Sequence, residues 1–145
     1  MNKLSDLITN IKTEIQRVPV QNAAALTILG FEIKEKAQSM IGTHQVFWKD
    51  LADSTIATKR RKHWGKGGDA SSPLWATGAY HDSIQYQLKG RNKVQIFSDE
   101  PYVEYLEWGT AKMPARPVFL PATKLVLRDF LGKGKLQGFY LKSLR

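Results

Sequence analysis

The chain has 145 residues, of which 42% are hydrophobic and 24% are charged, and this balance excludes a wholly disordered or fibrous protein. It contains no cysteine, which excludes disulfides and cysteine nucleophiles, and no apolar run approaches the roughly 18 to 20 residues of a membrane span, so neither such a span nor a signal peptide is expected. Twenty-two Lys and Arg against thirteen Asp and Glu give a net charge of +9, which favours phosphates or acidic proteins as partners without selecting a DNA-binding function.

The first part of the chain shows helical periodicity in two segments. Apolar residues recur every three or four positions up to Pro19, so we expect a first helix that ends near Arg17. A second apolar stripe begins near Asn22 and lasts until Gly42, which suits a helix C-cap. This second segment is predicted to be the longest helix and a core element.

The periodicity fades over residues 43–73, where a basic run precedes a glycine-rich one. Asp53 or Ser54 can cap a short helix that lasts to about His63, and the glycines beyond it disfavour a helix. A loop of this length in a small domain is commonly functional or disordered, and we expect part of it to be mobile. Its basic side chains are Lys59, Arg60, Arg61, Lys62 and Lys66.

Two segments in the second half alternate between apolar and polar residues, as half-buried strands do. They cover residues 84–88 and 94–97, and the turn-forming residues between them predict an antiparallel hairpin. A short helix is expected over residues 101–109 and a last helix over residues 122–132.

These elements predict an α+β fold in a single domain over residues 1–145. Its small antiparallel β-sheet is expected to pack against the long N-terminal helix and the shorter helices, with the basic loop beside them. The basic residues 133–145 are expected to form a loosely attached tail.

Three blocks of sequence carry a resemblance to a known family. Residues 73–84 read PLWATGAYHDSI, residues 101–110 read PYVEYLEWGT, and residues 113–122 read MPARPVFLPA. In order and spacing these blocks resemble the tail-completion proteins of tailed bacteriophages, and they are similar to the branch typified by the virion morphogenesis protein of phage Mu.

The resemblance implies a structural protein of a tailed phage or prophage and no enzyme. Such a protein completes the head-proximal end of the tail and joins it to the head, as a ring, expected to be hexameric, around the DNA channel. Its implied partners are further copies of itself, tail terminator or tail tube proteins, head connector proteins and passing phage DNA, with no membrane. Its place is the virion neck or tail, after assembly in the host cytoplasm. A tail terminator and a small sequence-independent DNA-binding protein are the alternative functions.

Exposed aromatic residues and arginine are typical anchors of protein interfaces. Our expected subunit or docking interface therefore consists of Tyr102, Tyr105, Glu107, Trp108, Arg116 and Phe119. Arg116 precedes a proline, which favours an extended backbone, and its guanidinium can then meet a carboxylate such as Glu107, within or between subunits.

The basic residues of the 43–73 loop form our expected DNA-channel surface, namely Lys59, Arg60, Arg61, Lys62 and Lys66. Trp48 and Trp64 lie nearby in sequence and can stack on bases. A solvated helix face that carries positive charge is the competing and more common interpretation.

Catalysis and metal binding find weaker support. Glu100, Glu104 and Glu107 have helical spacing and can be read as a divalent-metal site for phosphodiester hydrolysis, but a solvated or subunit-facing acidic stripe is commoner. The three histidines lack the spacing of a zinc site, and residues 65–68 lack the ending of a phosphate-binding loop. We therefore predict no catalytic residues, no metal and no cofactor.

Overall fold

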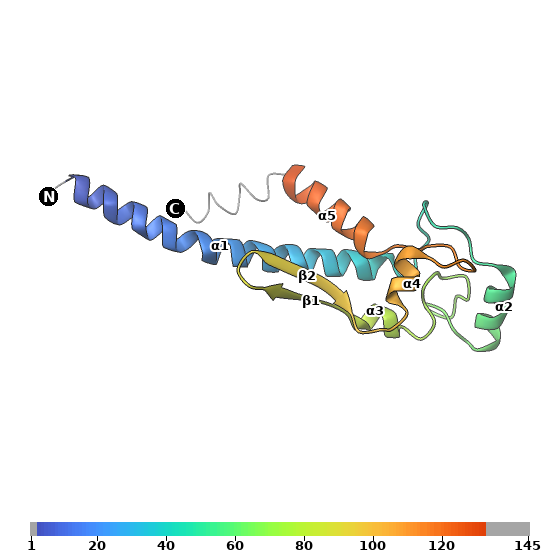
Figure 1. The fold of residues 1–145 in the computed structure, drawn as a ribbon. Coiled ribbons are helices and arrows are strands. Elements are labelled where there is room, and N and C mark those ends of the chain that lie inside the picture. Colours follow the sequence, from blue (N-terminus) through green and yellow to red (C-terminus); the bar gives the residue numbers. More distant parts are fainter. Residues whose placement is uncertain (1–2, 133–145) are drawn as a thin grey trace.

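A computed structural model describes the backbone of residues 3–132 and the side chains of residues 22–130 and 132. These residues form an α+β fold, as predicted (Figure 1). The predicted basic tail, residues 133–145, lies outside the described residues. The elements in chain order are α1 (Lys3–Met40), α2 (Asp53–Arg61), α3 (Ala79–Ser83), β1 (Ile84–Lys89), β2 (Lys93–Ser98), α4 (Val103–Trp108) and α5 (Phe119–Gly132).

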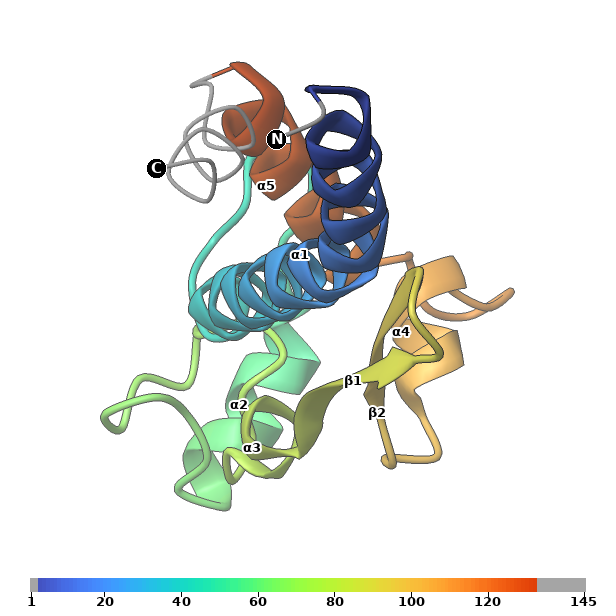
Figure 2. The same cartoon turned by 90° about the vertical axis from the view of Figure 1, so that its left-hand side faces the viewer.

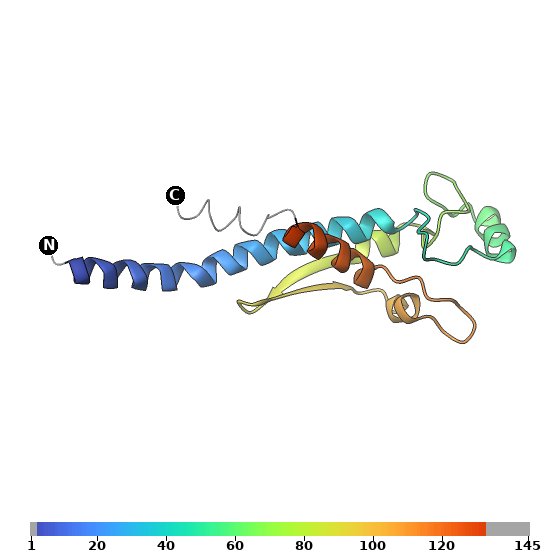
Figure 3. The same cartoon turned by 90° about the horizontal axis from the view of Figure 1, so that it is seen from above.

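Helix α1 is one continuous helix, so the predicted helix end near Arg17 is wrong. A proline inside a helix removes one backbone hydrogen bond and crowds the preceding turn, which bends a helix as readily as it ends one. Figure 3 shows that α1 changes direction in its N-terminal half, the half that contains Pro19. The predicted end at Gly42 is confirmed, because α1 stops at Met40 and Gly42 takes a positive φ of 78°.

The predicted antiparallel hairpin is confirmed. Strands β1 and β2 pair in a register that sets Ile84 opposite Ser98 and Lys89 opposite Lys93. The hairpin lies close against α1 at Gly30, where a Cβ atom would come within 2.6 Å of the Tyr86 ring. Helix α1 contacts both strands and α5, and Figures 1 and 2 show the hairpin and α5 on different sides of it.

The hydrophobic core lies where α1, β1 and α5 meet. On α1, Ile33, Ala37 and Met40 are buried, as is Ile41 directly after the helix, and this is the helical spacing predicted for the stripe. The other buried members of the core are Trp48, Tyr80, Ile84, Val118, Ala122 and Val126. Burial of one large aliphatic side chain contributes about 1.5–3 kcal/mol to folding, so this cluster is the main stabilising element.

The shorter helices agree with the sequence in place and differ in extent. Helix α2 lies inside the predicted range and α4 covers most of its own, whereas α5 begins three residues earlier than predicted, at Phe119. Helix α3 was not predicted from the sequence. No helix among the described residues is long and apolar enough to cross a lipid bilayer.

Candidate interaction site

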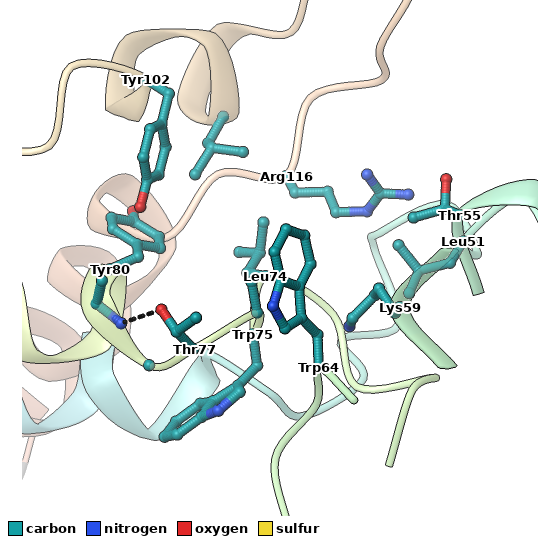
Figure 4. Close-up of a pocket in the computed structure, with 14 residues that line it drawn as sticks. Leu51, Thr55, Lys59, Trp64, Leu74, Trp75, Thr77, Tyr80, Tyr102 and Arg116 are labelled. Carbon is teal, nitrogen blue, oxygen red and sulfur yellow. Dashed lines mark hydrogen bonds between the residues drawn. The ribbon is translucent and has the colours of Figure 1, made fainter. Parts of the chain in front are cut away.

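The three sequence blocks meet around one pocket of about 350 Å³, which we call the three-block pocket (Figure 4). Residues of α2 and of the loop that flanks it complete its wall. The pocket is lined by Leu51, Thr55, Lys59, Trp64, Leu74, Trp75, Ala76, Thr77, Gly78, Ala79, Tyr80, Tyr102, Leu106 and Arg116.

Direct contacts hold the blocks together. The Tyr80 ring of the first block stands edge-on to the Tyr102 ring of the second, with 6.1 Å between their centroids. The Arg116 amide of the third block donates a 2.7 Å hydrogen bond to the carbonyl of Leu106 in the second. The arrangement of the pocket therefore depends on all three blocks.

Glu107 joins α4 to the start of α5. Its Oε1 atom accepts hydrogen bonds from the amides of Val118, at 2.6 Å, and Phe119, at 2.8 Å. The Phe119 amide begins α5 and the Val118 amide immediately precedes it, and at such a helix N-terminus a carboxylate both satisfies free donors and interacts favourably with the helix dipole. The cap explains why α5 begins earlier than predicted, since its carboxylate is distant in sequence from the helix that it caps.

The predicted ion pair between Arg116 and Glu107 does not form within the chain. Arg116 is only 7% exposed, and its Nη2 atom donates to the carbonyls of Lys49, at 3.0 Å, and Asp50, at 3.2 Å. Its Nε atom is buried without a hydrogen-bond partner, and burial lowers the pKa of the guanidinium. Arg116 thus anchors the 49–50 backbone from inside the protein instead of lying on an exposed surface.

The other predicted interface residues differ in exposure. Trp108 and Tyr105 are 79% and 58% exposed, and Tyr102 is exposed beside the three-block pocket. Phe119 is partly buried and packs against the core. Exposed aromatic rings of this size on one short helix are typical of a protein-binding surface.

A second concave surface lies on the other side of α4. This apolar groove, which we call the α4–α5 groove, has a volume of about 780 Å³. It could not be predicted from the sequence, because its walls come from four separate elements, α1, β2, α4 and α5. It is lined by Leu29, Ile33, Val94, Ile96, Val103, Glu104, Glu107, Trp108, Pro117, Phe119, Leu120, Thr123 and Leu127.

Of the five residues of the predicted basic surface, one is buried and four are exposed. Lys59 is buried at 7% exposure, and its Nζ atom donates to the carbonyl of Ser72. Burial lowers the pKa of Lys59, and the more distant charge of Asp69 opposes that shift. The exposed members are Arg60, Arg61, Lys62 and Lys66.

The three tryptophans near this surface, Trp48, Trp64 and Trp75, make contacts with other residues of the same chain. Trp48 is buried, and its indole nitrogen donates to the carbonyl of Pro117 at 3.1 Å, so it is not available to stack on a base. The Lys62 amine lies 4.3 Å from the centre of the Trp64 ring, and the Lys66 amine lies 5.4 Å from that of Trp75. These are cation–π contacts, which place positive charge at the rim of the three-block pocket.

Tyr80 is a buried ring between the blocks. Its hydroxyl has no hydrogen-bond partner in the structure, and burial raises its pKa, with smaller contributions from the charge of Glu107 and from Tyr102. Within the part of the chain whose side chains are described, no group of three His, Asp or Glu residues is arranged to hold a metal ion. Glu107 in particular is committed to the α5 cap instead of facing the other glutamates.

Comparison with protein-family models, with curated proteins and with solved structures gives no match to this chain.

Proposed function

We propose that this protein is a structural component of a tailed-phage virion that completes the head-proximal end of the tail and joins it to the head. The observation that carries the proposal is the convergence of the three blocks behind the family resemblance on one pocket. Contacts between the blocks also account for their residue types, as the Gly109 turn illustrates. Gly109 has a φ of 73°, and a Cβ there would lie 2.7 Å from the Ala115 nitrogen.

Assembly, without chemical turnover, is the proposed mode of action. A closed ring of identical subunits needs two different surfaces on each subunit, one of which meets the other on the next copy. Two such surfaces lie on either side of α4: the three-block pocket and the α4–α5 groove. The exposed rings of Tyr105 and Trp108 supply the large apolar area that interface anchors commonly have.

The exposed basic residues at the C-terminal end of α2 and directly after it are proposed to face the DNA channel. Arg60, Arg61, Lys62 and Lys66 lie within one short stretch, and the chain carries a net charge of +9. Lysine and arginine side chains of this kind attract phosphates without reading sequence, which suits contact with DNA that passes through a ring.

The test is electron microscopy of lysates of the parent phage after disruption of this gene. We expect DNA-filled heads beside separate tails of normal length. Intact particles would contradict a joining role, and overlong tails would instead identify a tail terminator.

A small DNA-binding protein is the second candidate, favoured by the same exposed basic residues. That function predicts tight binding of the isolated protein to double-stranded DNA, with an affinity that falls steeply as salt rises. Binding that is weak at about 0.15 M salt, together with the separated heads and tails, would exclude it in favour of the joining role.

A further inference from the structure

Two buried cations line the three-block pocket. Lys59 and Arg116 are each 7% exposed, and Figure 4 shows the amine and the guanidinium at the same end of the pocket, on either side of Leu51 and beside Trp64. Among the described side chains, neither cation forms an ion pair with a carboxylate, and the charge of Asp69 acts on Lys59 without contacting it. Both donate only to backbone carbonyls, which are of Ser72 for Lys59 and of residues 49–50 for Arg116.

In the part of the chain that the structure describes, the buried positive charges of Lys59 and Arg116 therefore lack a negative group in direct contact. Buried charges are normally compensated by an opposite charge, because carbonyl dipoles replace only part of the lost hydration. The Nε–H group of Arg116 is moreover a buried donor that has no acceptor. An anionic oxygen in the pocket would supply both the charge and the missing hydrogen bond.

The other residues of the pocket wall determine which kind of anion fits best. Leu51, Trp64, Leu74 and Leu106 make most of the lining apolar. A phosphodiester would bring further charged and hydrated oxygens against these side chains, at a desolvation cost. A carboxylate that is attached to an apolar group fits the pocket better, with its oxygens on the cations and its hydrocarbon on the leucines and Trp64.

A second copy of the chain has a carboxylate and an apolar group of this kind on its surface. With a net charge of +9, copies repel one another unless a local acidic region of one meets a local basic region of the next. Glu104 and Tyr105 are consecutive exposed residues on α4 and supply a carboxylate and an aromatic ring. Glu104 lines the α4–α5 groove, whereas Leu106 of the same helix and Tyr102 just before it line the three-block pocket, so the two surfaces are distinct.

We propose that the three-block pocket of one copy receives Glu104 and Tyr105 of the next copy, with the Glu104 carboxylate against Arg116 and Lys59. The inference rests on the ring of the proposed function and identifies one contact within it. The contact is heterologous, so it can repeat around a ring.

The first experiment blocks each side of the contact without disturbing the core. Thr55 is an exposed residue on the pocket wall in the first turn of α2, where a glutamate is well tolerated. Thr55→Glu should place a carboxylate at the pocket and exclude the next copy, and Glu104→Lys should reverse the incoming charge. Sedimentation velocity of the full chain should show that both variants lose the oligomers formed by the parent protein at high concentration.

Matched controls separate this effect from net charge. Ala57→Glu lies on the same helix outside the pocket, and Glu35→Lys makes the same charge reversal on α1, both at exposed positions. Both controls should assemble as the parent protein does. Circular dichroism should show that all four variants are folded, and equal loss of assembly in variants and controls would overturn the contact.

Mixing the two blocked variants gives a sharper test. Thr55→Glu keeps an intact Glu104, and Glu104→Lys keeps an intact pocket, so an equimolar mixture retains one working contact. It should form 1:1 dimers and nothing larger, while each variant alone remains monomeric. A mixture that stays monomeric under conditions in which the parent protein assembles would overturn the proposal.

Disulfide trapping covers the case in which free copies associate weakly. The chain has no cysteine, so the double variant Thr55→Cys with Trp108→Cys introduces the only thiols and keeps the Glu104 carboxylate, which lies one turn before the exposed Trp108 on α4. Under mild oxidation it should give a ladder of cross-linked oligomers, whereas each single variant should stop at dimers. If no ladder forms, the contact is wrong; if Thr55→Glu phage still assembles complete particles while gene disruption separates heads from tails, the joining role stands without it.

Discussion

Two regions of the molecule are held together in different ways. The helix–hairpin region, made of α1, β1, β2 and α5, is stabilised by apolar side chains such as Ile33, Met40 and Ile84 packed between elements. The α2 region, made of residues 43–83 and 99–118, adds Trp48, Tyr80 and Val118 to that core and is held in addition by side chains that bond to backbone atoms, namely Arg116, Lys59 and Glu107.

The difference separates stability from recognition. Apolar burial is non-directional and contributes over the whole core, so its loss lowers the stability of the entire fold. A hydrogen bond to a backbone carbonyl or amide fixes the local path of the chain, and its loss disturbs mainly that path. We therefore expect mutations in the helix–hairpin region to unfold the protein and mutations in the α2 region to change its surface.

The largest effect is expected for Met40→Ala. The Met40 side chain is 1% exposed, and its truncation should lower the free energy of unfolding by about 2–5 kcal/mol, through lost burial and the cavity left behind. Urea unfolding measures this change. Ile28→Ala on the same helix, at a side chain that is 42% exposed, should cost far less; equal costs would contradict the assignment of the core.

Gly109→Ala should have the next largest effect. With φ at 73° and ψ at 179°, residue 109 occupies a backbone region that is almost confined to glycine and costs other residues about 1–3 kcal/mol. The new Cβ would also collide with the Ala115 nitrogen. Gly67→Ala is the matched control, because φ is positive there too but no atom lies within 4 Å of the added Cβ. Thermal unfolding should show the larger loss for Gly109→Ala.

Glu107→Ala tests whether polar contacts order the α2 region locally. The substitution leaves the amides of Val118 and Phe119 without their acceptor, which should cost about 1–3 kcal/mol. Hydrogen–deuterium exchange should become faster at these two amides and change little in β1 and β2. Glu104→Ala on the same helix removes an exposed carboxylate and should leave the exchange unchanged. A uniform increase over the whole chain would mean that the cap supports the global fold.

The two regions also differ in what the sequence predicts. Apolar periodicity identified the core stripe of α1 and the hairpin, because spacing along one element determines which side chains share a face. It failed at Pro19, where the pattern does not distinguish a bend from a break. The periodicity of one element also carries no information about a groove whose walls come from several elements.

The candidate site was only partly predictable, for a related reason. The sequence singled out Arg116 and Lys59 as charged residues, and charged side chains are usually exposed. Their burial follows from backbone carbonyls of residues 49–50 and Ser72 that only the folded chain brings near them. Tyr105 and Trp108 were expected to be interface anchors, and their rings are exposed.

The smallest expected effect is that of Tyr80→Phe, which removes the polar hydroxyl and keeps the buried apolar ring. The hydroxyl is buried and has no hydrogen-bond partner, so its removal should change the free energy of unfolding by no more than about 1 kcal/mol at neutral pH. Burial raises the pKa of Tyr80 above the ordinary value of 10.0, so above pH 10 the unfolded chain loses this proton while the folded chain keeps it.

The stability contributed by this proton is therefore fully present below pH 10 and falls as the pH rises above 10. The stability of Tyr80→Phe does not depend on this proton. Between pH 10 and 11 the free energy of unfolding of the variant, measured in urea, should therefore rise by about 1 kcal/mol relative to that of the parent protein. Tyr105→Phe, which removes the hydroxyl of an exposed ring, is the matched control and should follow the parent protein. If Tyr80→Phe and the parent protein lose stability in parallel above pH 10, the Tyr80 hydroxyl is open to solvent, and the ring belongs to the surface of the three-block pocket more than to the core.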